Sequence, residues 1–305
     1  MHRFSILLAA ALVVTACATA RTAEPPSSSQ SLPALRASID ALTSRYPATW
    51  VEVAYHDLGS GDTLYINADS LVHAASTMKV PVMMRLYAES DAGTLPLDRK
   101  LVVQNHFVSV VDGSPYTLDP GDDSDSTMYK LVGDSVSVRE LMQHMITRSS
   151  NLATNTLIAL ANPDSINAMM RRFGANKMVV LRGVEDLKAF DRGMNNMATA
   201  RDLATLLAAI ETGHAGSPAS TDAMRNTLLA QEFNEKIPAG LPPGVRVAHK
   251  TGEITAGSHD AAIVYPPGRS PYVLVVLTRG FQNEHTADSL IANISRDVYA
   301  YDTRH

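Results

Sequence analysis

The sequence predicts a mixed α/β fold of the α+β type: an antiparallel five-stranded sheet built from both ends of the chain, flanked by helices, with an inserted all-helical subdomain. Two observations predict this architecture. Strand-like apolar runs lie near the two ends, within residues 50–66 and 245–277, whereas apolar residues at helical spacing fill the stretch 77–211. Strands on either side of a block of helices indicate a single sheet with helices packed against it.

The N-terminal part of the fold begins with a helix, because Leu35, Ile39 and Leu42 recur at helical spacing. A strand is expected over 50–55, followed by a turn rich in Gly and Ser and a second strand over 63–66. This order predicts a β-hairpin.

The middle of the chain is expected to be helical, and the C-terminal part returns to strands. A last helix over 287–299 is expected to cover the sheet. The polar segment 104–130 is expected to be a loop on the surface, with a lip over a cleft as the less favoured alternative. The other expected elements are helices over 77–89, 138–147, 152–161, 165–173 and 200–211, and strands over 245–252, 261–265 and 272–277.

The composition is that of an ordinary globular protein. The chain has 305 residues, of which 45% are hydrophobic and 19% charged. We expect one folded domain over 34–305, with a sheet subdomain (about 34–75 and 215–305) and a helical subdomain (about 76–214). The formal net charge of −5 leaves no basic excess, so no nucleic-acid partner is expected.

The N-terminus has the layout of an export signal. A basic start at Met1-His2-Arg3 precedes an apolar run over 4–14, which is too short to span a membrane. Cys17 follows directly after Val14-Thr15-Ala16, and this order resembles the lipobox of bacterial lipoproteins. The resemblance implies that residues 1–16 are a signal peptide and that Cys17 becomes the lipidated N-terminus.

An ordinary signal cleavage after Ala20, which would discard Cys17, is the alternative. Residues 17–33 are rich in Ala, Pro, Ser and Thr and are expected to form a flexible tether. We therefore expect an exported, periplasmic protein that contacts the membrane only through a lipid anchor. Because Cys17 is the only cysteine, no disulfide forms within the domain, and packing must supply its stability.

Ser76 and Lys79 form a candidate nucleophile pair. Ser76 stands at the start of a predicted helix, and Lys79 follows one turn later on the same face. A serine hydroxyl needs a base to take its proton, and a lysine that burial keeps neutral can be that base. The N–H groups at the helix start are suited to a developing oxyanion. A Ser-x-x-Lys pair also arises by chance about once in a chain of this length, so the pair alone is weak evidence.

Two further motifs strengthen this interpretation. Ser149-Ser150-Asn151 lies between two predicted helices, where it can pass a proton and hold a substrate amide, or only cap a helix. Lys250-Thr251-Gly252 lies on an expected strand, where Lys and Thr can hold a substrate carboxylate and Gly leaves room. The alternative is an edge strand with a solvated lysine. The three motifs in this order, on these elements, indicate a catalytic site.

These motifs resemble the Ser-x-x-Lys, Ser-Asp-Asn and Lys-Thr-Gly signature of class A β-lactamases and penicillin-binding proteins. The resemblance covers essentially residues 35–302 and implies the two-part α/β fold of that superfamily for the whole mature chain. It extends past the three motifs to Ala75-Ser76-Thr77-Met78-Lys79-Val80-Pro81, Val138-Arg139-Glu140-Leu141 and His259-Asp260-Ala261-Ala262-Ile263-Val264.

For the first chemical step, the resemblance implies that Ser76 is the acylated nucleophile and that Lys79 is its proton acceptor or relay. Ser149 is implied to pass the proton to the leaving nitrogen. Asn151 is implied to contact the substrate amide.

The resemblance assigns substrate binding to the third motif. Lys250 and Thr251 are implied to bind the substrate carboxylate. The oxyanion hole is implied to consist of the backbone N–H groups of Ser76 and of Glu253, the residue after Gly252.

For the second step, class A enzymes carry a glutamate on a loop, where it activates the water that hydrolyses the acyl-enzyme. The stretch Leu181-Arg182-Gly183-Val184-Glu185 is similar to that loop and places Glu185 at the position of this glutamate. An exposed loop glutamate without a catalytic role is the alternative.

Three residues depart from the family pattern. The middle Asp of the second motif is Ser150. The asparagine that holds the water with the glutamate is replaced by Ala189, for which Asn195 or Asn196 is a candidate substitute. An arginine that assists carboxylate binding in many class A enzymes is replaced by His259.

The leading hypothesis is a monomeric serine β-lactamase that acts on a small-molecule β-lactam or a peptidoglycan peptide. No metal or cofactor is expected, since the histidines show no H-x-H or H-x-x-x-H spacing. The alternatives are a D,D-peptidase or penicillin-binding protein with slow deacylation, an esterase on the same scaffold, and a catalytically silent lipoprotein that binds cell-wall fragments. Glu185 distinguishes the first two hypotheses, because penicillin-binding proteins usually lack a dedicated deacylation base.

Overall fold

The computed structural model describes residues 31–47 and 49–304. The expected signal peptide (1–16), Cys17 and the tether up to residue 30 lie outside the described residues. Within the described part of the chain, no helix is both long and apolar enough to cross a membrane.

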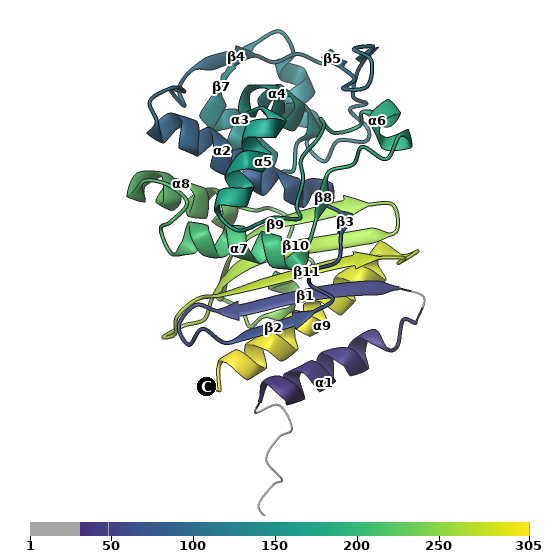
Figure 1. The fold of residues 1–305 in the computed structure, drawn as a ribbon, viewed down its shortest axis with the longest axis vertical. Helices are drawn as coiled ribbons and strands as arrows, with labels where there is room; N and C mark the ends of the chain where they lie inside the picture. Colours follow the sequence, from purple (N-terminus) through teal and green to yellow (C-terminus); the bar gives the residue numbers. More distant parts are fainter. Residues whose placement is uncertain (1–30, 48, 305) are drawn as a thin grey trace, which may run out of the picture.

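The centre of the fold is an antiparallel five-stranded sheet, as the sequence predicts (Figure 1). β1 pairs with β11 from Trp50 opposite Arg279 to Asp57 opposite Tyr272. The first and last strands of the chain therefore meet in the sheet, and β9 forms one of its edges. The strand order is β2 (Thr63–Ile66), β1 (Trp50–Asp57), β11 (Tyr272–Arg279), β10 (Gly257–Tyr265) and β9 (Arg246–Ile254).

Alternating side chains give the sheet two apolar faces. Tyr55 of β1 packs in one cluster with Ile39 of α1 (Leu32–Thr43) and Ile294 of α9 (Glu284–Asp302). Its neighbour Ala54 belongs to the other core, which the sheet shares with the helical part. Figure 1 shows α1 and α9 on one side of the sheet and α7 (Ala200–Glu211) on the other.

The expected helices of the middle of the chain are present and pack together beyond α7 (Figure 1). An unexpected helix, α8 (Pro218–Leu229), packs against β9 and α3. Its sequence does carry an N-terminal signal, because Ser217 caps the helix and Pro218 occupies its first turn. The other helices are α2 (Lys79–Asp91), α3 (Val138–Thr147), α4 (Asn151–Ala161), α5 (Pro163–Arg172) and α6 (Leu187–Asp191).

Short elements connect the sheet to the helical part. The two-residue strand β3 leads into the turn η1, which contains Ser76, and pairs with β8, which precedes α7. The short elements are β3 (Val72–His73), η1 (Ala75–Met78), β4 (Lys100–Val102), β5 (Phe107–Val108), β6 (Pro115–Tyr116), η2 (Ser126–Leu131), β7 (Ser135–Ser137), β8 (Met197–Ala198) and η3 (Pro238–Gly240).

The segment 104–130 is largely exposed, as expected of a surface segment, and it also forms the lip over the cleft that we considered as the alternative. Asp186 attaches it to the loop before α6, because the carboxylate accepts hydrogen bonds from Ser109 Oγ at 2.8 Å and from Val110 N at 2.9 Å. Four of its residues line the cleft described below: Thr117, Asp119, Asp122 and Ser124. Sequence polarity did not reveal this role, because the contacts that hold the segment come from residues far along the chain.

Candidate active site

A cleft of about 770 Å³ lies where the helical part meets the edge strand β9. Lys79 and Lys250 lie behind its wall and are fully buried. The other predicted site residues within the domain all line the cleft: Ser76, Ser149, Asn151, Glu185, Thr251, Gly252 and Glu253. Of the described candidate residues, none is left outside this region.

Ser76 lies in η1, directly before α2, rather than in the long helix itself. The preceding Ala75 has a φ of 45°, a left-handed conformation that is unfavourable for residues other than glycine and is often found at functional sites. η1 packs against β9, where a Cβ added at Gly252 would lie 3.1 Å from Ser76 N. Glycine at this position therefore keeps open the space in front of the Ser76 N–H.

Lys79 reaches across from α2 to the second motif. Its Nζ donates hydrogen bonds to the carbonyl oxygen of Ser149 (2.6 Å), to Ser149 Oγ (3.2 Å) and to Asn151 Oδ1 (3.0 Å). Burial lowers the pKa of Lys79 to about 7, and the negative charges of Asp123 and Glu185 oppose this shift. The lowered pKa makes it easier for Lys79 to be neutral than for a lysine in solvent, as a base for Ser76 must be.

Lys250 approaches the same hydroxyl from the sheet. Its Nζ donates to Ser149 Oγ at 3.0 Å and to the carbonyl oxygen of Thr251 at 2.8 Å. Burial lowers the pKa of Lys250 well below its usual value, and the positive charge of Lys79 lowers it further. The first and third motifs thus meet at one atom of the second.

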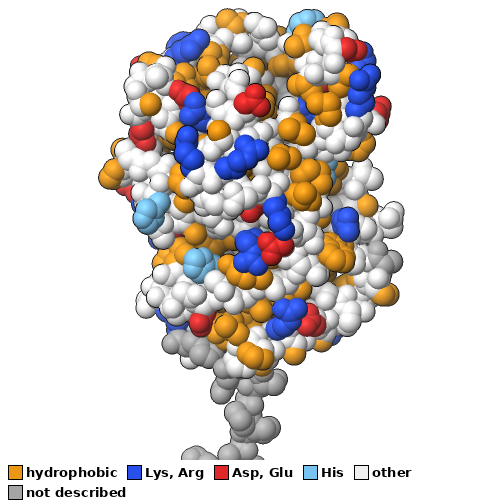
Figure 2. Space-filling view, viewed as in Figure 1, with side chains coloured by type: hydrophobic (Ala, Val, Ile, Leu, Met, Phe, Trp, Pro, Cys, Tyr) orange, Lys and Arg blue, Asp and Glu red, His pale blue; other side chains and the backbone are white. Residues whose placement is uncertain are grey.

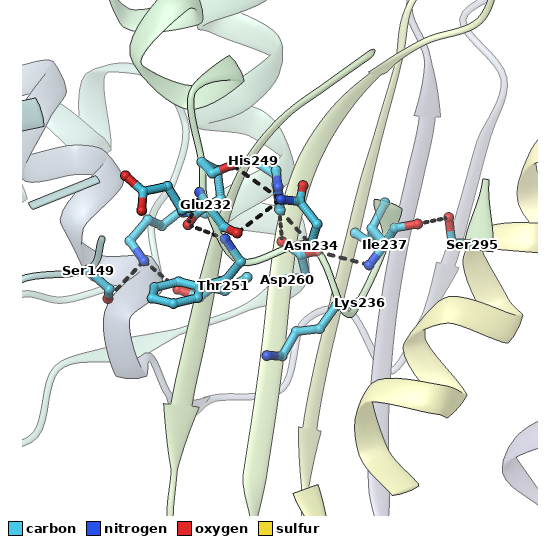
Figure 3. A network of polar contacts seen from close by, with 12 residues as sticks. Ser149, Glu232, Asn234, Lys236, Ile237, His249, Thr251, Asp260 and Ser295 are labelled. Atoms are coloured by element: carbon cyan, nitrogen blue, oxygen red, sulfur yellow. Dashed lines mark hydrogen bonds and ion pairs between the residues drawn. The ribbon is translucent and has the colours of Figure 1, made fainter. Parts of the chain in front are cut away.

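A network of buried polar contacts fixes β9 from behind (Figure 3). His249 Nδ1 lies 3.0 Å from Asp260 Oδ1 on the neighbouring strand. The second oxygen of Asp260 accepts the Ile237 N–H at 3.0 Å, and the Ile237 carbonyl accepts Ser295 Oγ of α9 at 2.9 Å. The strand that carries Lys250 is therefore connected through hydrogen bonds to the helix that covers the opposite face of the sheet.

Glu185 faces the second motif from the loop between α5 and α6. Asn151 Nδ2 donates to Glu185 Oε1 at 2.9 Å, while the same amide accepts Lys79 through its oxygen. One helical turn further along α4, Asn155 holds the loop by accepting the Val184 N–H at 2.6 Å and donating to the Val184 carbonyl at 3.0 Å. Asn155 was missed by the sequence analysis, although its spacing of four residues from Asn151 was a usable signal.

The backbone around this contact is in an unfavourable conformation. Ser149 has a φ of 57° and Glu185 a φ of 60°. Together with Ala75, these residues place three left-handed, non-glycine conformations at or beside the predicted catalytic positions. Such conformations persist only where surrounding contacts hold them, which is a common property of active sites.

The pKa of the Glu185 carboxyl is raised above its usual value, as expected of a group that takes up a proton. Burial raises the pKa of Glu185, and the nearby charges of Asp122 and Asp123 raise it further. The hydrogen bond from Asn151 and the charge of Lys79 act in the opposite direction. A carboxylate whose pKa is raised is a better base than one in open solvent.

Both candidate substitutes for the missing asparagine form hydrogen bonds with Arg182 of the loop that carries Glu185. Asn195 Oδ1 accepts a hydrogen bond from Arg182 Nη2 at 3.0 Å. Asn196 Oδ1 accepts the N–H groups of Leu181 and Arg182, and its Nδ2 donates to the Arg182 carbonyl. Both side chains stabilise the loop that carries Glu185.

His259 does not act as a cation at the cleft. It is buried, and its Nδ1 accepts the Thr278 N–H at 3.1 Å while its Nε2 lies 2.9 Å from the His73 carbonyl oxygen. The neutral ring with its proton on Nε2 satisfies both contacts, and burial lowers the pKa of His259, which favours this neutral form. His259 links β10 to the segment that precedes Ser76.

A cation that the sequence analysis missed lies beside the third motif. Lys236 is 1% exposed, and its Nζ donates to Glu253 Oε1 at 2.7 Å and lies 3.5 Å from Asp288 Oδ1. Glu253 lines the cleft with its side chain half exposed. The carboxylate of Glu253 therefore neutralises a buried cation at the wall of the cleft.

The charged side chains on the molecular surface do not form a patch of one sign on the face that Figure 2 shows. On the face shown in Figure 2, basic and acidic side chains are interspersed. A second hollow of about 380 Å³ adjoins the cleft at residues 253–255.

Comparisons with known proteins agree with this geometry. The model of the beta-lactamase enzyme family matches residues 34–301. Beta-lactamase AST-1 of Nocardia asteroides is 31% identical over 247 residues, which cover 79% of this chain and 76% of that protein. A beta-lactamase of Streptomyces albus G is 28% identical over the same shares of both chains.

Solved structures give the same result. A point mutant of PBP-A, captured as an acyl-enzyme with penicillin G, superposes with a TM-score of 0.77 at 28% identity and covers 90% of this chain and 98% of its own. A mutant of the class A beta-lactamase of the last common ancestor of Gram-negative bacteria has a TM-score of 0.77 at 28% identity, covering 89% of this chain and 99% of that one.

The fold and the cleft define a serine hydrolase in which Lys79 of α2 and Lys250 of β9 both contact Ser149. The match over residues 34–301 gives the particular group: the chain belongs to the beta-lactamase enzyme family.

Proposed function

We propose that this protein is a serine β-lactamase that hydrolyses the β-lactam amide through an acyl-enzyme on Ser76. The observation that carries the proposal is the continuous hydrogen-bonded path from Lys250 through Ser149, Lys79 and Asn151 to Glu185 along the wall of the Ser76 cleft. The path contains a group for each proton transfer that two acyl-transfer steps require.

In the acylation step, neutral Lys79 takes the proton of Ser76 Oγ as this oxygen attacks the lactam carbonyl. The C–N bond then breaks, and Ser149 gives its proton to the leaving nitrogen while it takes up the proton that Lys79 received from Ser76. The N–H groups of Ser76 and Glu253 stabilise the oxyanion of the tetrahedral intermediate, which forms before the C–N bond breaks.

Binding in this proposal depends on the third motif. Thr251 and Lys250 bind the substrate carboxylate through hydrogen bonds. Gly252 leaves the space through which the substrate reaches the Ser76 N–H. This is supported by the distance of only 3.1 Å that would separate a Cβ at position 252 from Ser76 N.

In the deacylation step, Glu185 removes a proton from water, and the resulting hydroxide attacks the ester carbonyl on Ser76. Ester cleavage returns the proton to Ser76 Oγ. A base placed in this way contributes a factor of about 10²–10⁴ in rate. Because Ala189 replaces the family's second ligand for this water, we expect modest turnover.

The test is to compare wild type with Glu185→Gln on a chromogenic cephalosporin, following both colour and protein mass. Wild type is expected to turn over without a persistent adduct. Glu185→Gln is expected to release about one equivalent of product and then to stall with the adduct on Ser76. Ser76→Ala is the matched control and should show neither labelling nor turnover.

A D,D-peptidase that is acylated by penicillin but deacylates slowly is the second candidate, and the similarity to PBP-A favours it. It would be indicated if wild type itself stalled after one equivalent. Normal turnover by Glu185→Gln would place the base elsewhere and contradict the role of Glu185.

We also propose that the protein is exported to the periplasm and anchored by lipid at Cys17. The supporting observation is the position of the only cysteine directly after an apolar N-terminal run. The mature protein should begin at Cys17 and fractionate with membranes. Unchanged fractionation of Cys17→Ala, together with a native N-terminus at Arg21, would overturn the anchor.

A further inference from the structure

Asp123 is a buried carboxylate in the segment 104–130, and it makes direct contacts with the second motif. It is 7% exposed. Its Oδ2 accepts the N–H groups of Asn151 and Leu152, both at 2.9 Å, and its Oδ1 lies 3.0 Å from Asn151 N. One side chain from a loop therefore satisfies two of the free N–H groups at the start of α4.

The carboxylate is itself held in place from its own segment. Oδ1 also accepts the Asp125 N–H at 3.0 Å, and Oδ2 accepts the Tyr129 hydroxyl at 3.1 Å. Backbone and side-chain donors of the lip thus fix Asp123, and Asp123 in turn fixes the first residues of α4.

These contacts bear on Ser149 and Asn151. Ser149 adopts the left-handed φ of 57°, and surrounding contacts must hold such a conformation. Ser150 Oγ caps α4 through the Ala153 N–H, but Asp123 satisfies the earlier N–H groups of the helix. Asn151, which contacts both Lys79 and Glu185, is therefore positioned by the lip as well as by its own helix.

The negative charge of Asp123 acts on Lys79 and Glu185, the two residues that Asn151 contacts. It opposes the burial effect that lowers the pKa of Lys79, and it contributes to the raised pKa of Glu185. The other charged groups near Lys79 are Glu185 and Lys250, and those near Glu185 are Asp122 and Lys79.

We propose that Asp123 is a positioning residue for both steps of the reaction, because it holds the Ser149–Asn151 turn and places a negative charge beside Lys79 and Glu185. The inference rests on the proposed function for its effect on rates, but its geometric and electrostatic parts concern the free protein. It assigns the segment 104–130 a role in catalysis without contact with the reacting atoms.

The test uses Asp123→Asn, which keeps the size of the side chain but removes its charge and one acceptor. Acylation is expected to slow about 10- to 100-fold, since small displacements of catalytic groups cost factors of this order. Asp134→Asn is the matched control, because it removes an exposed carboxylate outside the cleft, and its rates should equal those of wild type.

A second measurement needs no substrate. The ¹³Cε resonance of Lys79, assigned by its loss in Lys79→Met, is titrated in wild type, Asp123→Asn and Asp134→Asn. Wild type should titrate near the pKa of about 7. Asp123→Asn should titrate at lower pH because the charge that favours the protonated amine is gone.

The rate profiles should move in the same direction. The rate of acylation falls at low pH when Lys79 is protonated, and the rate of deacylation falls when Glu185 is protonated. In Asp123→Asn, we expect both of these losses of rate to occur at lower pH than in wild type. A purely structural role would lower the rates without shifting either loss to lower pH.

The outcomes separate this inference from the proposed function. An unchanged Lys79 titration together with unchanged acylation overturns the role of Asp123, whatever the protein hydrolyses. If wild type shows no reaction with β-lactams but the Lys79 titration moves as expected, only the proposed function fails. Asp123→Ser is the second neutral variant, and failure of both variants to fold would make Asp123 a residue of the fold as a whole and overturn the inference.

Discussion

The Oγ of Ser149 accepts hydrogen bonds from two buried lysines, Lys79 Nζ at 3.2 Å and Lys250 Nζ at 3.0 Å. A serine hydroxyl has two lone pairs and one O–H. Because both lone pairs face lysines, the Ser149 proton is left to point toward a bound substrate. The three motifs of the sequence therefore converge on an atom that is ready to donate.

Ser149→Ala should separate amide from ester substrates. Acylation by a β-lactam, whose leaving nitrogen needs a proton, is expected to fall by about 10²–10⁴. Acylation by a p-nitrophenyl ester should fall much less, because its leaving group departs as an anion. Stopped-flow rates on both substrates measure the difference, and thermal unfolding checks the fold. Equal losses on the two substrates would rule out proton donation by Ser149.

Lys79→Met should change how stability depends on pH. The pKa of Lys79 is about 7 in the folded protein and 10.5 in the reference state. Between these values the unfolded chain binds the proton that the folded protein does not, so the stability of wild type relative to the variant rises with pH. The expected slope is about 1.4 kcal/mol per pH unit, fading above pH 10.5. Urea unfolding of both proteins from pH 6 to 10 measures it.

The control for this slope is Lys130→Met, which removes an exposed lysine. It is unfolded over the same pH range to measure the effect of removing an exposed lysine. A flat stability difference between wild type and Lys79→Met would mean that Lys79 keeps its charge in the folded protein.

His259→Ala should act on stability rather than on substrate choice. The variant leaves the His73 carbonyl and the Thr278 N–H without their buried partner. We expect a loss of about 2–4 kcal/mol in the free energy of unfolding. Substrates with a free carboxylate and with an esterified one should be affected alike. A KM that rises only for the free carboxylate would show that His259 replaces the family's arginine after all, and His285→Ala on the exposed side of α9 is the control.

Glu253→Gln should improve the binding of substrates that carry a carboxylate. The side chain of Glu253 pairs with Lys236 at 2.7 Å and lines the cleft half exposed, so its negative charge opposes the approach of a substrate carboxylate. Interactions between charges at such an exposed position are worth about 1 kcal/mol, which corresponds to a KM lower by about fivefold. Steady-state kinetics with free and esterified substrates test this, with the exposed Glu235→Gln as control. A higher KM for the free carboxylate would show that Glu253 assists binding.

Local patterns in the sequence determined the elements and the identity of most of the site. The spacing of Ser76 and Lys79, the position of Ser149-Ser150-Asn151 between two helices and the strand context of Lys250 are all properties of short segments. Short segments report backbone preference and apolar periodicity directly. Where that periodicity was weak, as on α8 with its buried Ser220, Thr221 and Thr227, the helix was missed.

The tertiary structure decided which groups share a hydrogen bond. Asp123 and Asn151 are 28 residues apart, Asn155 and Val184 are 29 apart, and His259 and His73 are 186 apart. No periodic pattern encodes such pairs, because they depend on how whole elements pack. The sequence by itself therefore determined the three motifs and the sheet from both chain ends. Only the packing of the lip, α4 and β9 around one cleft decided that Ser149 lies between two lysines and that Asp123 accepts the first N–H groups of α4.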